Sequence, residues 1–271
     1  MKPAICFIVL TGILCLLACL YTSKVEDSQT FTRPASTFTS LTLDTRNGAI
    51  TATANTDTLA SVKVTRYAYG RNKTDATNQL NGITITDTVS AGNWSLTANF
   101  PAVTKPMGAL MAADVPANTR LNILTSNGDV TVSGIAAPIS VATSNGDVIL
   151  TGTSGDAEIS TSNAKVIVQV HSGGIDINTS NGEIDCDLSF LPATSGAELA
   201  TSNGKVTLRL PPDVSAYITA TTSNGTVVIT GYQVHYDENT QKHIKARIGS
   251  GASPITITTS NGDIVIQNRV R

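Results

Sequence analysis

The 271-residue chain contains few cysteines, and most of them lie in one short segment. Cys6, Cys15 and Cys19 belong to an apolar N-terminal stretch, so only Cys186 remains in the body of the protein. This distribution excludes a disulfide framework. Cys186 shares its phase with Ile184 and is interpreted as a small core residue, not as a nucleophile.

Aromatic residues make up 4% of the chain and charged residues 14%, with a formal net charge of −2. This balance argues against nucleic acid as a partner, because phosphate binding requires clustered lysine and arginine. The sequence also lacks a Gly-x-Ser-x-Gly elbow, a His-Glu-x-x-His motif, a phosphate loop and a Cys-His pair. We therefore expect a protein that is not an enzyme, with no catalytic residues, no cofactor and no metal site.

What the chain has in abundance is one tetrapeptide, Thr-Ser-Asn-Gly. Copies begin at Thr125, Thr143, Thr179, Thr201, Thr222 and Thr259, and a Thr-Ser-Asn-Ala copy begins at Thr161. From Thr125 to Thr179 the copies, including the alanine variant, start 18 residues apart. Repetition at a fixed period indicates a stack of similar supersecondary units.

Each period contains two predicted strands and two corners. Apolar residues alternate after each tetrapeptide, as at Val130 and Val132, and before it, as at Ile139 and Val141. We expect the Asn-Gly pairs to form the tight corner by accepting positive φ. These predicted turn residues are Asn127, Gly128, Asn145, Gly146, Asn181, Gly182, Asn203, Gly204, Asn224, Gly225, Asn261 and Gly262.

Two arrangements of these strands are open. Pairing within a period gives a meander, whereas pairing of each strand with its counterpart one period later gives a parallel β-solenoid. The second is favoured because it stacks Thr on Thr, Asn on Asn and aliphatic on aliphatic at about 4.8 Å per coil. The sequence thus predicts an all-β, single-chain parallel β-solenoid (β-helix) of about 18-residue, two-strand coils with Ser-Asn-Gly corners.

The residue after each Asn-Gly or Asn-Ala would form a further column along the stack. Because lysines interrupt the acids, we expect a ladder of alternating charge there and no calcium site. The column comprises Asp129, Asp147, Lys165, Glu183, Lys205, Thr226 and Asp263.

The N-terminal segment indicates export. Residues 3–21 are almost wholly apolar after Lys2, as in a signal peptide. Within this segment, Leu16-Leu17-Ala18-Cys19 resembles a bacterial lipobox, which predicts residues 1–19 as the leader and Cys19 as the lipidation site. The alternatives are plain secretion and an uncleaved anchor, since about 19 apolar residues nearly span a bilayer. Residues 20–37 are polar and predict a tether.

The predicted solenoid domain, 38–271, has two parts. In the decorated part, 38–118, the stretch Lys73–Leu80 predicts a short helix capped by Thr74, and 101–116 predicts a long loop. The part from 119 to 271 carries the regular repeats. A tyrosine- and histidine-containing excursion, 232–248, interrupts them and predicts a hairpin or one degenerate coil.

That excursion has two interpretations. It is the best candidate on the chain for partner contact, and the candidate residues are Tyr232, His235, Tyr236 and His243. It is also suited to cover an open sheet edge, which is the more common role of such a segment. We favour the cap.

Taken together, the repeats resemble a known family. The iterated Ser-Asn-Gly-Asp-Val-x-Val units, the element Leu210-Pro211-Pro212 and the closing Ile248-Gly249-Ser250-Gly251 are similar to the bacterial putative-adhesin β-strand repeat family, long classed as a domain of unknown function. The resemblance covers approximately residues 38–271. It implies an exported β-solenoid of the cell envelope and carries over no catalytic residue.

The functional hypotheses follow from this resemblance and from the composition. The first is a non-catalytic adhesin or surface scaffold, held to the membrane by a lipid, whose partner is an envelope protein or a surface polymer. The alternative is an envelope-stress or signalling accessory that binds membrane partners. A carbohydrate-active β-helix enzyme is a third hypothesis, which would need two carboxylates about 5 to 10 Å apart among residues such as Asp176, Asp185 and Asp187.

Overall fold

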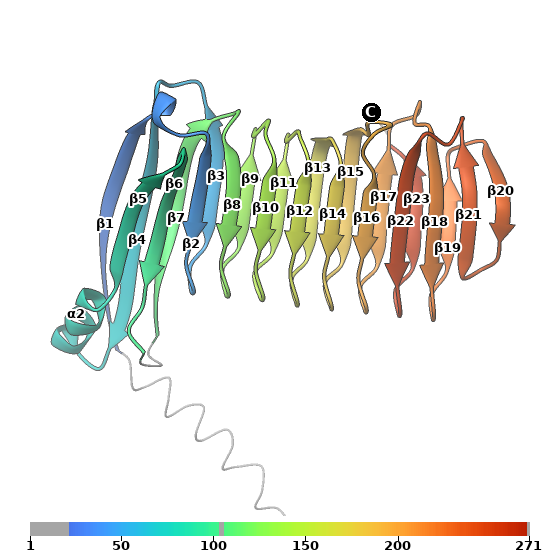
Figure 1. The fold of residues 1–271 in the computed structure, drawn as a ribbon. Helices are drawn as coiled ribbons and strands as arrows, with labels where there is room; N and C mark the ends of the chain where they lie inside the picture. Colours follow the sequence, from blue (N-terminus) through green and yellow to red (C-terminus); the bar gives the residue numbers. More distant parts are fainter. Residues whose placement is uncertain (1–21, 103–105, 270–271) are drawn as a thin grey trace, which may run out of the picture.

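The computed structural model describes residues 22–102 and 106–269 of the chain. Within these residues the strands form an 11-stranded and a 12-stranded sheet, here called sheet A and sheet B. The coils stack side by side along one axis, with helix α2 at one end and the hairpin β20–β21 at the other (Figure 1). The predicted leader, 1–19, and the lipidation site Cys19 lie outside the described residues.

The elements are bounded as follows. In spatial order, sheet A contains β1 (Ser23–Pro34), β4 (Leu59–Gly70), β7 (Met107–Pro116), β3 (Ile50–Asn55), β9 (Val130–Ser133), β11 (Val148–Thr151), β13 (Val166–Ser172), β15 (Ile184–Phe190), β17 (Val206–Leu210), β23 (Ile264–Asn268) and β19 (Val227–Thr230). Sheet B contains β20 (Val234–Asn239), β21 (His243–Ile248), β18 (Ala216–Thr222), β22 (Ser253–Thr259), β16 (Ala197–Ala200), β14 (Ile175–Asn178), β12 (Ala157–Ser160), β10 (Ile139–Ala142), β8 (Arg120–Leu124), β2 (Ser40–Asp44), β6 (Asn93–Asn99) and β5 (Thr84–Ser90). The helical elements are η1 (Ala35–Thr37) and α2 (Lys73–Asn81).

Central strands pair in parallel with their counterparts in neighbouring coils. Val148 lies opposite Val130 on one side and Val166 on the other. In sheet B, Ile139 lies opposite Leu121 and Ala157 in the same way. The all-β class and the parallel pairing of like with like are therefore confirmed, and a meander is excluded for these coils.

The core lies between the two sheets and follows directly from strand alternation. Val130, Val132, Val148 and Leu150 on sheet A have no solvent exposure, and Ile139 on sheet B is 2% exposed. Burying an aliphatic side chain of this size stabilises the fold by about 1.5–3 kcal/mol. Cys186 is fully buried as predicted, and burial raises the pKa of its thiol.

The asparagines of the repeated corner form one continuous ladder. Except at Asn47, which only accepts within the ladder, each side-chain amide nitrogen donates to the Oδ1 atom of the asparagine in the adjacent coil, over 2.6 to 2.8 Å. The ladder runs through Asn47, Asn127, Asn145, Asn163, Asn181, Asn203, Asn261 and Asn224. Such ladders are a stabilising device of stacked parallel strands.

The glycines of the corner are needed for close approach, and not for positive φ as the sequence predicted. Positive φ is found instead at glycines of the looser corner, such as Gly134 and Gly152. A Cβ on Gly204 would lie 1.9 Å from the carbonyl oxygen of Gly182, and one on Gly146 would lie 1.9 Å from that of Gly128. Coils can therefore stack at this corner because the residue has no side chain.

Buried threonine hydroxyls link the corner of one coil to the next. The Thr201 Oγ1 atom donates to the carbonyl oxygen of Gly182 at 3.0 Å and accepts the N–H of Gly204 at 3.2 Å. Thr259 makes the same two contacts, with Gly204 and Gly262. The first residue of the tetrapeptide thus satisfies backbone groups that the tight corner would leave unpaired.

The coils at both ends of the stack are placed out of sequence order. Strand β22 lies between β16 and β18, and β23 lies between β17 and β19. At the other end, β2 lies between β6 and β8, and β3 lies between β7 and β9. The column predicted in sequence order is corrected accordingly, since Asp263 stands between Lys205 and Thr226.

Two predictions about the N-terminal part are wrong. The expected tether contains strand β1, which pairs antiparallel with β4 over residues 23–34. The expected loop at 101–116 contains strand β7, which joins β4 to β3 and buries Met107, Ala109 and Met111. Both segments are strands because they complete the edge of sheet A, a pairing between distant segments that local sequence does not reveal.

The N-terminal end is closed by a helix and by ion pairs. Helix α2 confirms the predicted helix, although its cap is Asn72, whose side chain accepts the N–H of Asp75 at 2.9 Å, and not Thr74. Arg33 on β1 pairs with Asp87 on β5 and so joins the two sheets. Charged side chains between terminal strands protect a sheet edge from pairing with another chain.

Candidate functional site

A surface hollow lies on the outer face of sheet B. It has a volume of about 770 Å³, within the range of small-molecule sites. Gly174, Gly196, Pro138 and Pro254 are among the residues that line it. The lining comes from several coils, so the hollow runs across neighbouring strands.

Four carboxylates and Arg120 line this hollow, and three of the carboxylates, Glu158, Asp176 and Glu198, form a single row beside Asp156. Glu158 on β12 pairs in register with Asp176 on β14, which pairs with Glu198 on β16. All three are exposed, and among the described residues none forms an ion pair. Parallel strands place them about 4.8 Å apart, where like charges are unfavourable. Asp176 was predicted only as part of a different cluster, although the row is visible when the strands before each tetrapeptide are aligned.

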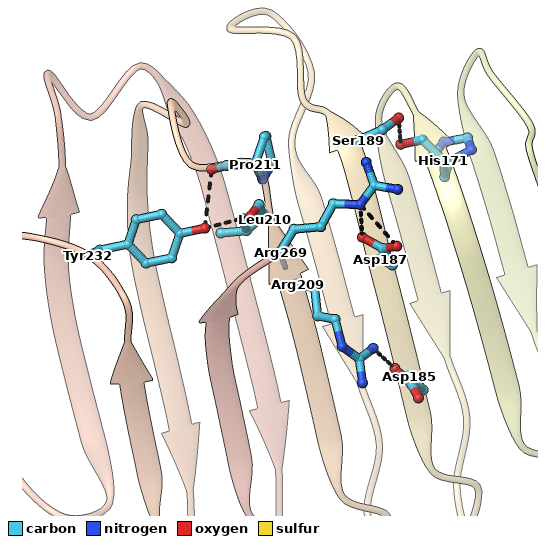
Figure 2. A network of polar contacts seen from close by, with 9 residues as sticks. All are labelled: His171, Asp185, Asp187, Ser189, Arg209, Leu210, Pro211, Tyr232 and Arg269. Carbon is cyan, nitrogen blue, oxygen red and sulfur yellow. Dashed lines mark hydrogen bonds and ion pairs between the residues drawn. The ribbon is translucent and has the colours of Figure 1, made fainter. Parts of the chain in front are cut away.

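The outer face of sheet A differs, because two neighbouring acids there, Asp185 and Asp187, are paired with arginines. Figure 2 shows Asp185 paired with Arg209, and Asp187 paired with Arg269, whose Nε lies 2.8 Å from Oδ1. Asp176 lies on the opposite sheet, so the structure does not bring it together with Asp185 and Asp187. The trio named for a carbohydrate-active site is therefore not a cluster.

The C-terminal excursion is an antiparallel hairpin that covers the edge of sheet B. Strand β21 pairs with β18, and β20 pairs with β21. The outer strand carries Asp237 and Glu238, which bind Arg247 and Lys245 across the hairpin at 2.7 Å each. The interpretation of 232–248 as a hairpin is confirmed, and its charged outer strand fits the role of a cap.

The four predicted partner-contact residues do not form one surface. The hydroxyl of Tyr232 lies 2.6 Å from the carbonyl oxygen of Leu210 and 3.1 Å from that of Pro211, so this ring anchors the chain (Figure 2). Burial raises the pKa of its phenol. The His243 Nε2 atom lies 3.1 Å from Glu238 within the hairpin. His235 and Tyr236 are exposed on β20, and partner contact there stays a prediction.

His171 is a fully buried histidine of the looser corner. Its Nδ1 atom lies 2.9 Å from Thr153 Oγ1, and its Nε2 atom lies 3.3 Å from the carbonyl oxygen of Gly174. Burial lowers the pKa of the imidazole, although the Gly174 carbonyl and Asp156 oppose this shift. The ring is thus held neutral as part of the structure.

This burial predicts a loss of stability in mild acid. The unfolded chain binds a proton to His171 near pH 6.5, whereas the folded protein does so only at lower pH. The free energy of unfolding should therefore fall as the pH drops below about 6.5. Urea titrations between pH 5.5 and 7.5 measure the slope, and His171→Asn should flatten it. An identical slope in both proteins would contradict this assignment.

The charge column beside the Asn ladder is present in the structure. Asp147 Oδ1 accepts the backbone N–H of Lys165 at 2.9 Å, and the Lys165 ammonium lies 3.6 Å from Glu183. At the far end, Asp263 accepts the N–H and the hydroxyl of Thr226, which lowers the pKa of its carboxyl. The acids here bind backbone donors. Among the described residues, no group of three or more His, Cys, Asp or Glu side chains could hold a metal ion.

Lys165→Glu should destabilise this column. The change places four acids in successive coils from Asp129 to Glu183, and we expect a loss of about 1 kcal/mol in dilute buffer. Added salt should restore part of the loss, because these groups are exposed and screened. Lys165→Gln is the control, and millimolar calcium should leave the melting temperature of the unmodified protein unchanged. A rise of several degrees with calcium would restore the metal-site hypothesis.

A family model described as Toastrack DUF4097 matches residues 88–267. The chain belongs to the Toastrack DUF4097 family. This match spans both the repeated coils and the hairpin, and it includes every residue that lines the hollow on sheet B except Ser40. No curated protein matches the sequence.

Solved structures similar to this Toastrack protein include a "putative cell adhesion protein" of Clostridium sporogenes, with 14% identity, a TM-score of 0.38 and coverage of 90% of this chain and 100% of that one. A "putative adhesin" of Bacteroides fragilis has 14% identity and a TM-score of 0.37, with coverage of 90% and 97%. A "putative lipid binding protein" of Parabacteroides distasonis has 12% identity and a TM-score of 0.38, again with coverage of 90% and 97%. At such TM-scores these names carry no argument about the function of this chain.

Proposed function

We propose that this Toastrack protein is a non-catalytic surface protein of the cell envelope, acting as an adhesin or scaffold through the outer face of sheet B. The observation that supports this proposal is the hollow along β12, β14 and β16, with its row of unpaired Glu158, Asp176 and Glu198. A row of separate charges suits an extended partner better than a compact one. Its sign favours a partner that presents basic groups.

The contrast between the two sheets supports this choice of surface. Neighbouring acids on sheet A are stabilised by arginines, whereas those on sheet B repel one another without a partner in the described residues. Polar groups that oppose stability are expected where function requires them. The buried thiol of Cys186 and the neutral, buried His171 offer no nucleophile or base at the surface.

Attachment to the envelope remains part of the proposal. Export and lipidation at Cys19 rest on the lipobox-like sequence, which lies outside the described residues. Among those residues, no helix is long and apolar enough to cross a membrane. Labelling with a palmitate analogue tests the anchor, since Cys19→Ser should abolish incorporation. Equal labelling of both forms would contradict lipidation.

Binding experiments with the full chain in detergent test the function. The protein is used to capture envelope proteins, and in parallel is mixed with whole cells and with purified cell-wall polymer. Binding should weaken in the triple variant Glu158→Gln, Asp176→Asn and Glu198→Gln, while its melting temperature stays equal or rises. A control variant, Asp57→Asn, Asp114→Asn and Asp213→Asn, removes the same charge from exposed positions elsewhere.

The outcomes separate the functional hypotheses. Retention by cells or polymer that depends on the acidic row supports an adhesin. Capture of a membrane protein instead supports the signalling accessory. Equal binding by both triple variants would show that the acidic row on sheet B is not the binding surface. Failure to bind envelope proteins, cells and polymer alike would contradict an adhesive role.

A further inference from the structure

The repeated corner contains a chemically fragile dipeptide. In an Asn-Gly sequence the glycine nitrogen can attack the side-chain carbonyl carbon of asparagine, because glycine has no side chain to obstruct it. The glycine nitrogen gives its proton to water or hydroxide and forms a bond with Cγ, the bond from Cγ to Nδ2 breaks, and the leaving nitrogen takes up a proton from water and departs as ammonia. Water then opens the resulting succinimide to aspartate or isoaspartate. Asparagine is accordingly among the thermolabile residues.

Four of the six Thr-Ser-Asn-Gly corners hold the attacking nitrogen in place. The glycine N–H donates to the threonine hydroxyl of its own tetrapeptide, over 3.1 to 3.2 Å. These pairs are Gly182 with Thr179, Gly204 with Thr201, Gly225 with Thr222, and Gly262 with Thr259. Attack on the adjacent asparagine requires this hydrogen bond to break.

In the other two corners the nitrogen is not held. Neither Gly128 N nor Gly146 N has a hydrogen-bond acceptor within the described part of the chain. Thr143 Oγ1 is buried without a partner, and Thr125 Oγ1 donates only to the carbonyl oxygen of Gly48, at 3.3 Å. The same tetrapeptide therefore occurs in two forms along one stack: in one the glycine N–H is bound to the threonine hydroxyl, and in the other it is not.

We propose that the threonine hydroxyl protects the Asn-Gly bond, and that Asn127 and Asn145 are the positions at which the folded protein deamidates. The six sites share the same immediate neighbours, Ser before and Gly after, so the sequence of the tetrapeptide cannot distinguish them. The asparagine amides of both groups donate along the ladder. The two groups therefore differ in whether the glycine N–H is hydrogen-bonded.

Conversion at Asn145 would have a defined structural effect. The Asn145 amide nitrogen donates to Asn127 Oδ1 at 2.8 Å, and a carboxylate has no such donor. The new charge would stand beside Asp147, one coil away from Asp129. Isoaspartate would in addition lengthen the backbone by one methylene group. The ladder would be interrupted at the middle of the stack.

Mass spectrometry of the aged protein tests this proposal. The full chain is incubated at mildly alkaline pH below its melting temperature, and separately in denaturing urea, and peptides covering each corner are analysed. In urea all six sites should convert at similar rates. In the folded protein Asn127 and Asn145 should convert about fivefold faster than Asn181, Asn203 and Asn261, the factor expected for one hydrogen bond.

A pair of variants tests the threonine directly. Thr201→Val removes the acceptor for Gly204 N and should accelerate conversion at Asn203 without affecting Asn145. Thr207→Val, on the outer face of the following strand of that coil, is the matched control. The comparison among sites in the unmodified protein needs no variant to fold. Equal rates at all six folded sites, or faster conversion at Asn203 than at Asn145, would overturn the proposal.

Discussion

Val148→Asp is expected to unfold the protein, whereas Thr131→Asp is expected to leave its stability nearly unchanged. Val148 has no solvent exposure and lies between Val130 and Val166 in the centre of sheet A. An unpaired carboxylate at this position costs several kcal/mol, a large share of the roughly 5–15 kcal/mol by which domains are stable. Thr131 lies on the neighbouring strand but faces outward, where substitutions stay within about 0.5 kcal/mol.

Circular dichroism and urea unfolding measure this pair. Val148→Asp should show no cooperative transition, and Thr131→Asp should unfold at the midpoint of the unmodified protein. The two substitutions introduce the same side chain on adjacent strands, so only the direction of the side chain differs. Similar midpoints for both variants would contradict the inward and outward phases described above.

Gly204→Ala should destabilise the corner by about 1–3 kcal/mol, the usual range for an added methyl group in a packed position. The new Cβ would lie 1.9 Å from the carbonyl oxygen of Gly182, and backbone atoms must move to admit it. That movement also disturbs the hydrogen bond from Thr201 Oγ1 to the same oxygen. Thermal unfolding should show the loss.

Ser202→Ala is the control for this substitution, because Ser202 is exposed and belongs to the same corner. The chain already contains one alanine at the equivalent position, Ala164, and the buried hydroxyl of Thr161 in that coil lacks a partner among the described residues. Equal stability of Gly204→Ala and the control would show that the stack adapts freely.

The period of the sequence was sufficient to predict the regular coils, because pairing of identical tetrapeptides satisfies both the backbone and the asparagine side chains. It could not predict the ends. Strand β7 buries Met107, Ala109 and Met111 but carries Leu110 and Ala112 on its outer phase, so its alternation of apolar and polar residues is weak. Strand β1 pairs antiparallel with a segment far along the chain. The hollow on sheet B was not predicted because its lining comes from several coils, whose order the sequence does not reveal.

The sequence also could not predict the order in which the coils are stacked. Any tetrapeptide copy can stack on any other, so the repeat does not say which coils are neighbours. The charged column illustrates this, since Asp263 binds Thr226 although 37 residues separate them. Order is decided by the hairpin β20–β21, which turns the chain back toward the interior of the stack.

The out-of-order coils hold strands from the end of the described chain inside the stack. In an ordinary solenoid the terminal coil contacts one neighbour and can peel away, after which the next follows. Here β22 and β23 each pair with a strand on both sides, so they cannot separate from the stack unless β18 and β19 separate first. The strands that come last among the described residues are therefore not the ones at the end of the stack, and the coil of β18 and β19 has to separate before they do.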